Sequence, residues 1–283
     1  MPTLHDIYHQ LELPHLVDHG HIILASAIGC QFIYWIGYYL SAWSGNKHFA
    51  ALSPIKRVDW ALHIVSSVHA VAICFLAFPI FGEPTLQKDK VYGYAPYAGD
   101  VYAIATGYFL WDTIICLYYI AQFGVGFALH GLACLTVFGL CFRPFLMYFG
   151  AVFLMFELST PFLNIHWFCD KTSRTGTKLQ LVNGMILLIV FFVARICFGF
   201  YSSADFFVTV YHRRHEIPIV NIAVYSIANI LLNALNVHWF SKMIRAIRSR
   251  FSPKDEKPKA RQINGVRKSN GVHKSATLLD KDR

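Results

Sequence analysis

Seven long apolar runs divide this chain, and short polar or aromatic segments separate them. An α-helix rises about 1.5 Å per residue, so roughly 20 apolar residues cross the 30 Å hydrocarbon core of a bilayer. Each run is long enough for one crossing, and the run at 124–141 is the shortest. We therefore expect seven membrane spans, at 21–41, 58–80, 98–120, 124–141, 145–165, 179–202 and 217–241.

These runs predict the fold class and the division of the chain. Backbone polar groups inside lipid must be satisfied within their own segment, so the spans are expected to be helices. We predict an all-α integral membrane protein with about seven transmembrane helices around a lipid-accessible polar cavity. Residues 1–20 form a short N-terminal lead and residues 21–245 the transmembrane domain. Residues 246–283 form a basic tail whose composition predicts disorder.

Six of the seven predicted spans carry a row of polar residues at helical spacing. Positions i, i+3, i+4 and i+7 share one helix face, and Glu157, Thr160 and Asn164 follow this pattern. Ser226, Asn229, Asn233 and Asn236 form the longest row. One such row is typical of a hydrogen-bonded seam between helices, whereas six rows favour a shared polar interior.

Four ionisable residues lie deep within these apolar runs: Asp112, His130, Glu157 and Arg195. Ionisable groups at this depth cost several kcal/mol unless they face a cavity or a partner, so they mark a candidate functional site. The alternative is that they only hold the bundle together, through bonds that average about 0.6 kcal/mol in membranes. For His130 alone, a neutral imidazole bonded to a neighbouring group remains open.

Composition and charge place the chain in a membrane and orient it. Of the 283 residues, 55% are hydrophobic and 14% are charged, whereas a soluble domain has about 25% charged residues. The net charge is +9, but 13 of the 25 Lys and Arg residues follow position 241. This basic tail suits an anionic cytoplasmic leaflet rather than a nucleic acid. Together with Lys and Arg in loops 42–57 and 166–178, it predicts a cytosolic C-terminus.

The sequence offers little for metal or nucleotide chemistry. Six of the seven cysteines lie within apolar runs and no CxxC pair occurs, so we interpret them as small buried hydrophobes. No Gly-rich phosphate loop or zinc spacing is present, and we expect no metal or resident cofactor. An iron enzyme of the desaturase kind also stays open, because imidazole nitrogens suit iron and six histidines lie on one predicted side of the membrane. They are His5, His9, His15, His19, His212 and His215, although no HxxHH box occurs.

Several short motifs, in order along five spans, resemble the TLC domain. This is the membrane domain of the translocation-associated, longevity-assurance and ceroid-lipofuscinosis proteins. The motifs are Arg57 with Ser-Ser-Val-His at 66–69, Gly107-Tyr108 with Asp112, the mid-helix His130, Glu-Leu-Ser-Thr-Pro-Phe-Leu-Asn at 157–164, and Arg195. The resemblance covers roughly residues 50–245. It implies a helical bundle around a lipid-accessible cavity, usually in the endoplasmic reticulum.

Two departures separate this chain from the ceramide synthases of that family. Gly131 follows His130 where the synthases have a second His, and Glu157-Leu-Ser-Thr stands where they have a His-Asp pair. The chain is therefore more similar to the smaller TLC-domain proteins, which are tied to membrane lipid composition.

These considerations give two sets of candidate site residues. His130 is the candidate general base, and Glu157 or Asp112 would orient its imidazole. Candidate substrate-binding residues carry hydroxyl, amide, imidazole or guanidinium groups: Arg195, His69, Ser66, Tyr108, Thr160, Asn164, Asn229 and Asn233. Arg195 would face negative charge on an acyl carbonyl or a phosphate.

The sequence favours one function and leaves others open. We expect a protein of membrane lipid homeostasis that binds an acyl-chain or sphingoid-like lipid, with membrane lipids as its partners. The alternative is an acyltransferase that uses His130, with acyl-CoA as co-substrate. A transporter or seven-helix receptor is less favoured, because no inverted repeat or pair of broken helices is visible.

Overall fold

The computed structural model describes residues 13–143 and 145–251, and all regular secondary structure in this part is helical. Six helical segments are long and apolar enough to cross a membrane, and Val125–Leu140 is a shorter apolar helix. Each of these seven segments coincides with one predicted span, so the predicted all-α multi-pass fold is confirmed. The 16 residues of Val125–Leu140 rise only about 24 Å, which explains why this span is the shortest.

The helices follow one another in a simple order, and two spans are interrupted by a different helix type. The interruptions are a 3₁₀ turn, η2 (Met155–Ser159), and a π turn, η3 (Phe192–Cys197). The long elements are α2 (Leu16–Trp43), α4 (Pro54–Ala77) with the 3₁₀ turn η1 (Phe78–Gly82), α6 (Pro96–Tyr118), α8 (Val125–Leu140), α9 (Met147–Leu154), α10 (Thr160–Lys171), α11 (Lys178–Phe191), α12 (Phe198–His212) and α13 (Ile219–Phe251). Short helices α3 (Lys47–Ala50), α5 (Pro84–Lys88) and α7 (Ile120–Phe123) lie in the connections.

The first and last long helices extend beyond the predicted limits of the transmembrane domain. Helix α2 begins at Leu16, five residues before the predicted start, because a helix can continue through a polar turn such as Asp18-His19 beyond the apolar run. Helix α13 runs to Phe251, so residues 246–251 belong to a helix and not to the tail. The remaining parts of the predicted lead and tail, 1–12 and 252–283, lie outside the described residues.

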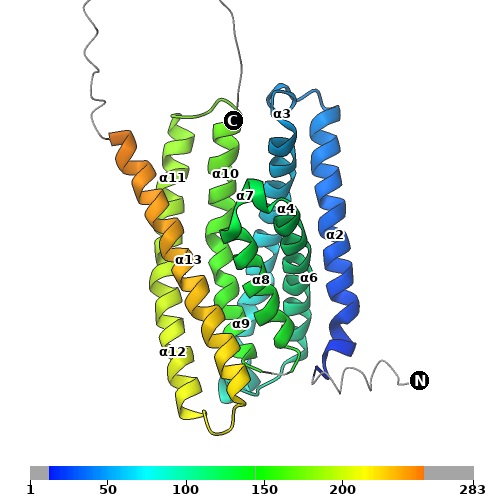
Figure 1. Ribbon diagram of the computed structural model, residues 1–283, viewed down its shortest axis with the longest axis vertical. Coiled ribbons are helices and arrows are strands. Elements are labelled where there is room, and N and C mark those ends of the chain that lie inside the picture. The colour runs from blue at the N-terminus through cyan, green and yellow to red at the C-terminus, as the bar shows by residue number, and fades with distance from the viewer. Residues whose placement is uncertain (1–12, 144, 252–283) are drawn as a thin grey trace, which may run out of the picture.

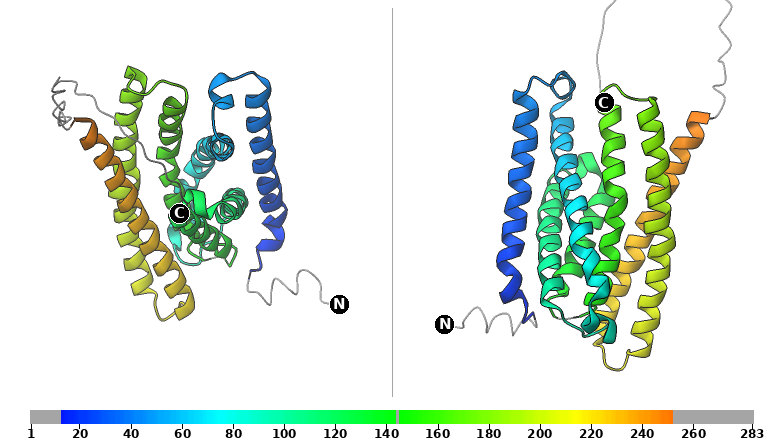
Figure 2. Two further views of the ribbon diagram at one scale, coloured as in Figure 1. Left: turned by 45° about the horizontal axis from the view of Figure 1, so that its top comes forward. Right: turned by 180° about the vertical axis from the view of Figure 1, so that it is seen from behind.

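The first and last described helices point to opposite ends of the bundle (Figures 1 and 2). Helix α2 begins at the lower end in Figure 1, whereas α13 finishes at the upper end. The upper end also carries α3 and the α10–α11 connection, which contain Lys47, Lys171 and Arg174. The basic loops and the C-terminal helix end therefore share one side, as the loop charges predict. That this side faces the cytosol stays a prediction.

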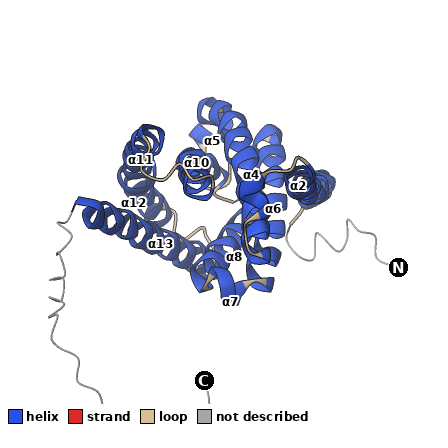
Figure 3. Ribbon diagram, turned by 90° about the horizontal axis from the view of Figure 1, so that it is seen from above, coloured by secondary structure: helices blue, strands red, loops and turns tan. Residues whose placement is uncertain are grey.

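The contacts between helices close six of the spans into a ring, and α2 packs outside it, as Figure 3 lets the reader follow. Around the ring, α4 contacts α6, α6 contacts α8, and α8 contacts α13. The chain of contacts continues from α13 to the α11–α12 span, then to α10, and returns to α4. Helix α2 packs against α6 and α4. The predicted seven-helix wall is thus a six-helix wall, and α2 is the span without a predicted polar row.

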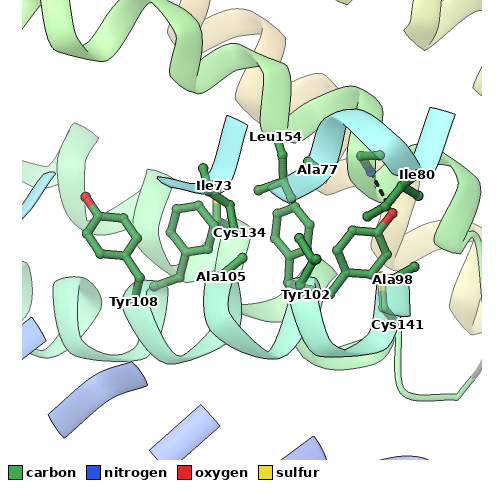
Figure 4. Close-up of a cluster of buried hydrophobic side chains, with 14 of the residues drawn as sticks. Ile73, Ala77, Ile80, Ala98, Tyr102, Ala105, Tyr108, Cys134, Cys141 and Leu154 are labelled. Carbon is green, nitrogen blue, oxygen red and sulfur yellow. Dashed lines mark hydrogen bonds between the residues drawn. The ribbon is translucent and has the colours of Figure 1, made fainter. Parts of the chain in front are cut away.

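Helix α6 supplies much of the packed core with small and aromatic residues on one face. Figure 4 shows Ala98, Tyr102 and Ala105 pointing from α6 toward α4 and Leu154. Tyr102 is fully buried, and its hydroxyl donates to the Met147 carbonyl oxygen at 2.6 Å and accepts from the Ala151 N–H at 2.7 Å. These two bonds fix the start of α9 against α6.

Asp89, in the connection between α5 and α6, makes stability depend on pH at the lower end. Burial alone would raise its pKa, but the Tyr92 and Val91 N–H groups and Arg213 outweigh it and hold the pKa of Asp89 below its usual 3.8. A carboxyl whose pKa is lowered by folding stabilises the fold above its unfolded pKa, and this is lost as pH falls through the lowered value. We expect the melting temperature to drop below about pH 4, and less so in Asp89→Asn. Identical acid profiles for the two proteins would contradict this role.

Candidate functional site

Two helix interruptions face each other in the ring and bring Arg195 to Glu157. Pro161 has no N–H, and the Thr160 N–H turns back to the Glu157 carbonyl oxygen in 3₁₀ fashion. The Phe156 carbonyl oxygen thereby loses its α-helical donor. On the other side, the π turn η3 adds one residue to a turn of the α11–α12 span, and such π turns are frequent at functional sites. Arg195 Nε donates to the exposed Phe156 carbonyl oxygen at 2.9 Å.

Arg195 is buried and its donors are directed at protein groups. Nε also donates to the Ser159 hydroxyl at 2.9 Å, and Nη2 donates to the Thr160 hydroxyl at 3.3 Å. Nη1 donates to Asn236 Oδ1 at 3.3 Å. Nη2 lies 3.7 Å from Glu157 Oε1, which makes a buried ion pair. Each nitrogen of the guanidinium therefore already donates to a protein group. In this conformation Arg195 does not offer a free pair of nitrogens to an acyl carbonyl or a phosphate, as its predicted role requires.

A narrow slot lies beside this ion pair, between α8, the α9–η2 segment, α12 and α13. Along α8 its walls extend from His130 to Cys141, which is about 16 Å of helix, and its open volume is about 50 Å³. Most of its walls are aromatic or aliphatic, including Phe109, Phe138, Phe149, Phe153, Phe156, Phe206, Leu146 and Leu232. Its ionisable and amide lining residues are His130, Glu157, Asn229, Asn233 and Asn236.

The Asn row of α13 forms the polar wall of the slot. Asn233 Nδ2 donates to the Ser203 hydroxyl at 2.8 Å and to the Asn229 carbonyl oxygen and Oδ1 at 2.9 and 3.0 Å. Asn233 is 9% exposed and Asn236 only 2%. Asn233 Oδ1 and Asn236 Nδ2 nevertheless have no hydrogen-bond partner among the described residues. Such buried orphans are uncommon in folded proteins and indicate a place where a ligand or a water binds.

His130 reaches the slot but is not paired with a carboxylate. Its ring nitrogens lie 3.8 and 3.9 Å from Cys134 Sγ, and its ring meets Trp239 edge to face at 5.4 Å. No hydrogen bond within residues 13–143 and 145–251 joins it to Glu157 or Asp112. The only hydrogen bond of the half-buried Asp112 in this part comes from Cys116 Sγ at 3.8 Å. The predicted arrangement of His130 with an orienting carboxylate is therefore not formed in this conformation.

A second polar cluster, formed by His63, Ser66, Ser67 and Asn164, lies between α4 and α10. Asn164 Nδ2 donates to the hydroxyls of Ser66 and Ser67 at 2.8 and 2.7 Å. Its Oδ1 lies 2.7 Å from His63 Nδ1, which must therefore carry the proton. Every polar group of the Asn164 side chain is thus satisfied. This is a seam that joins two helices, and it does not line the slot.

The structure thus divides the predicted site residues into groups. His130, Glu157, Asn229 and Asn233 line the slot, and Arg195 with Thr160 lies directly behind Glu157. His69 stacks on Tyr108 at 3.7 Å between α4 and α6, away from the slot walls. Ser66 and Asn164 belong to the second cluster. The expected single polar interior is therefore wrong, because helical spacing identifies a face but not the helix that covers it.

Sequence reasoning left Asn236 out of the site, although it lies three residues after Asn233 in the same row. The aromatic walls of the slot were missed as well. A Phe that lines the slot and a Phe that faces lipid follow the same sequence pattern. Within the described residues, no group of three or more His, Cys, Asp or Glu side chains could hold a metal ion. Both His19 nitrogens are engaged, by Asp100 and by the Tyr94 hydroxyl at 2.8 Å each. His5 and His9 lie outside the described residues.

Comparison with known proteins agrees with the motif pattern. The TLC-domain family model matches residues 59–245. An uncharacterized TLC domain-containing protein of Schizosaccharomyces pombe is 42% identical over 238 residues, which cover 84% of this chain and 82% of that protein. Topoisomerase I damage affected protein 4 of Saccharomyces cerevisiae is 33% identical, covering 84% of this chain and 88% of its own.

More distant relatives carry the same family name. Human TLC domain-containing protein 4 is 29% identical over 219 residues, which cover 74% of this chain and 81% of that protein. No solved structure matches the chain. The family match spans six of the seven spans and both halves of the Arg195–Glu157 pair. The chain therefore belongs to the TLC-domain family, and it is similar to small TLC domain-containing proteins rather than to ceramide synthases.

Proposed function

We propose that this protein serves membrane lipid homeostasis by holding one single-chain lipid inside its helix ring. The observation that carries this proposal is the slot between α8, α9–η2, α12 and α13. It is long, narrow and walled by apolar side chains, and it meets a polar wall near the Arg195–Glu157 pair. An acyl chain fits such walls, and the few polar groups would fix its head.

The size of the slot adds a condition to this proposal. Ligand pockets usually enclose about 300–1,000 Å³. With about 50 Å³ of open space, the slot as it stands is far smaller than such a pocket. A lipid chain therefore enters only when aromatic walls such as Phe149, Phe153 and Phe206 change rotamer. The ring would be closed without ligand and wider with it.

The proposal includes a location and an orientation. The TLC family resemblance favours the endoplasmic reticulum membrane, and the basic end of the bundle favours a cytosolic C-terminus. Membrane lipids are then both the solvent and the source of the ligand.

Filling the slot tests the proposal. Val137 lines the slot on α8, whereas Leu129 on the same helix is 39% exposed toward lipid. We expect Val137→Phe to remove most of the lipid that co-purifies with the wild type, measured by mass spectrometry of extracts, while the matched Leu129→Phe keeps it. If both variants retain the same lipids in wild-type amounts, the lipid does not bind in the slot.

A second function, acyl transfer from acyl-CoA, is favoured by one observation: His130 and Glu157 both line the slot. General-base catalysis would need His130 within one hydrogen bond of the nucleophile. Under our first proposal, membranes incubated with labelled acyl-CoA, long-chain amines and lysolipids yield no new product. A product that the wild type makes and a folded His130→Ala loses would establish the acyltransferase instead.

A further inference from the structure

We propose that the polar wall of the slot, at Asn233 and Asn236, binds the uncharged hydroxyl group of a long-chain alcohol, and that it discriminates against charged heads. This inference rests on the proposed function, because it names the chemistry of the lipid head. Two buried amide atoms and one ion pair carry it: Asn236 Nδ2, Asn233 Oδ1 and the pair Arg195–Glu157.

Asn236 lines the slot and has a buried donor without a partner among the described residues. An Asn side chain can be turned so that its oxygen and nitrogen exchange places, and its partners decide the orientation. Arg195 Nη1 lies 3.3 Å from the side-chain oxygen, and a guanidinium can only donate. The oxygen of Asn236 must therefore face Arg195. Its NH₂ group is directed elsewhere, and it has no partner among the described residues.

Asn233 presents the complementary free acceptor. Its side-chain nitrogen faces the Asn229 carbonyl oxygen at 2.9 Å, and a carbonyl can only accept. The nitrogen must therefore lie on that side, which leaves Oδ1 unpartnered in the described part of the chain. Asn233 and Asn236 are three residues apart on one face of α13, and both line the slot. A hydroxyl group both donates and accepts, so a single hydroxyl has the chemistry to pair with both atoms.

The electrostatics of the same wall disfavour a charged head. An anionic head needs a free cation, but each nitrogen of Arg195 already donates to a protein group, and Glu157 Oε1 lies 3.7 Å from Nη2 and offsets the charge. A cationic head needs a free carboxylate, but Glu157 lies 3.7 Å from Arg195, which offsets its charge. A charge brought from water into this site would lose its hydration without gaining an unpaired counter-charge. An uncharged hydroxyl avoids that cost.

Photoreactive alkyl probes of one chain length and three heads test this inference on the full-length protein in nanodiscs. The heads are a primary alcohol, a primary amine and a phosphate. Labelling of slot residues is measured by peptide mass spectrometry and divided by labelling of Ile230, which is 60% exposed on the outer face of α13. This ratio corrects for the different partitioning of the probes into the bilayer. We expect the alcohol to reach half-maximal slot labelling at least tenfold below the other two probes.

The variant Asn236→Asp removes the donor and places a carboxylate beside Arg195. It keeps an oxygen toward Arg195 and replaces the free NH₂ by a second acceptor, so the alcohol loses one hydrogen bond. We expect its half-maximal concentration to rise about tenfold, while Val237→Leu, 44% exposed on the same helix, leaves it unchanged.

The outcomes separate the inference from the function beneath it. Equal slot labelling by all three probes, or a preference for the amine or phosphate, overturns the alcohol inference and leaves lipid binding intact. If none of the three probes labels slot residues more strongly than it labels Ile230, the proposed function itself fails. The comparison of heads uses the wild type, so it stands even if Asn236→Asp folds poorly.

Discussion

Replacing Arg195 by Leu is expected to lower the free energy of unfolding by about 3–5 kcal/mol. The substitution leaves Glu157 buried, at 7% exposure, without its cation. It also removes the Nε donor from the Phe156 carbonyl oxygen and leaves the Ser159 hydroxyl as its other side-chain donor. Unfolding in mixed micelles, followed by circular dichroism during titration with a denaturing detergent, measures the loss.

A double variant shows whether the loss comes from the uncompensated charge. Arg195→Leu combined with Glu157→Leu removes both members of the pair, and well-packed apolar substitutes for buried ion pairs are often tolerated. We expect the double variant to be more stable than Arg195→Leu alone. Arg195→Lys keeps the charge but loses the planar fork, so it should lie between the wild type and Arg195→Leu. A double variant as unstable as the sum of the two single changes would contradict the coupling of Glu157 with Arg195.

Substituting Gly107 is expected to detach α2 from the ring. A Cβ at this position would lie against the Ile23 carbonyl oxygen, 2.6 Å from Ser26 Cβ and 3.0 Å from the Ala27 nitrogen. Backbone atoms cannot move aside as a flexible side chain can, so the helices must separate. We expect Gly107→Ala to cost about 1–3 kcal/mol and Gly107→Val more. Unfolding in mixed micelles measures the cost, and protease sensitivity near α2 reports the separation.

Gly29 provides the matched control for this contact. It lies on α2, and a Cβ there meets nothing within 4 Å. Since Ala favours helix over Gly by about 1 kcal/mol, Gly29→Ala should be neutral or stabilising. If Gly107→Ala were as stable as Gly29→Ala, the close approach of α2 and α6 would be wrong.

The positions of the spans could be predicted from the sequence because the bilayer imposes a length and an apolar composition on each helix. The same apolar composition gives no information on how the helices pack against one another. A Leu that faces lipid and a Leu that faces another helix are equally apolar, so the pattern could not show that α2 lies outside a ring of six. The absence of a polar row in that span was the available signal. Boundaries at Leu16 and Phe251 were missed because polar helix turns can continue beyond the hydrocarbon core.

The site was predictable in part, for a related reason. Ionisable residues inside apolar runs are costly, so Glu157 and Arg195 could be identified, and the structure pairs them at 3.7 Å. Pro161, which has no N–H, follows the 3₁₀ turn, and the Phe156 carbonyl oxygen of that turn accepts from Arg195 Nε. The π turn at Arg195 has no sequence signature that we could use. Helical spacing likewise could not show that Asn164 joins α10 to α4 while Asn233 faces the slot.

Mapping a single-chain lipid on the protein tests the central claim most directly. A palmitoyl-length probe with a photoreactive group near the chain end would be cross-linked in nanodiscs, and the modified peptides identified by mass spectrometry. The account predicts cross-links to slot residues such as Phe153 and Phe206, which Val137→Phe removes. Cross-links confined to lipid-facing residues such as Ile227 and Ile230, unchanged by Val137→Phe, would contradict it.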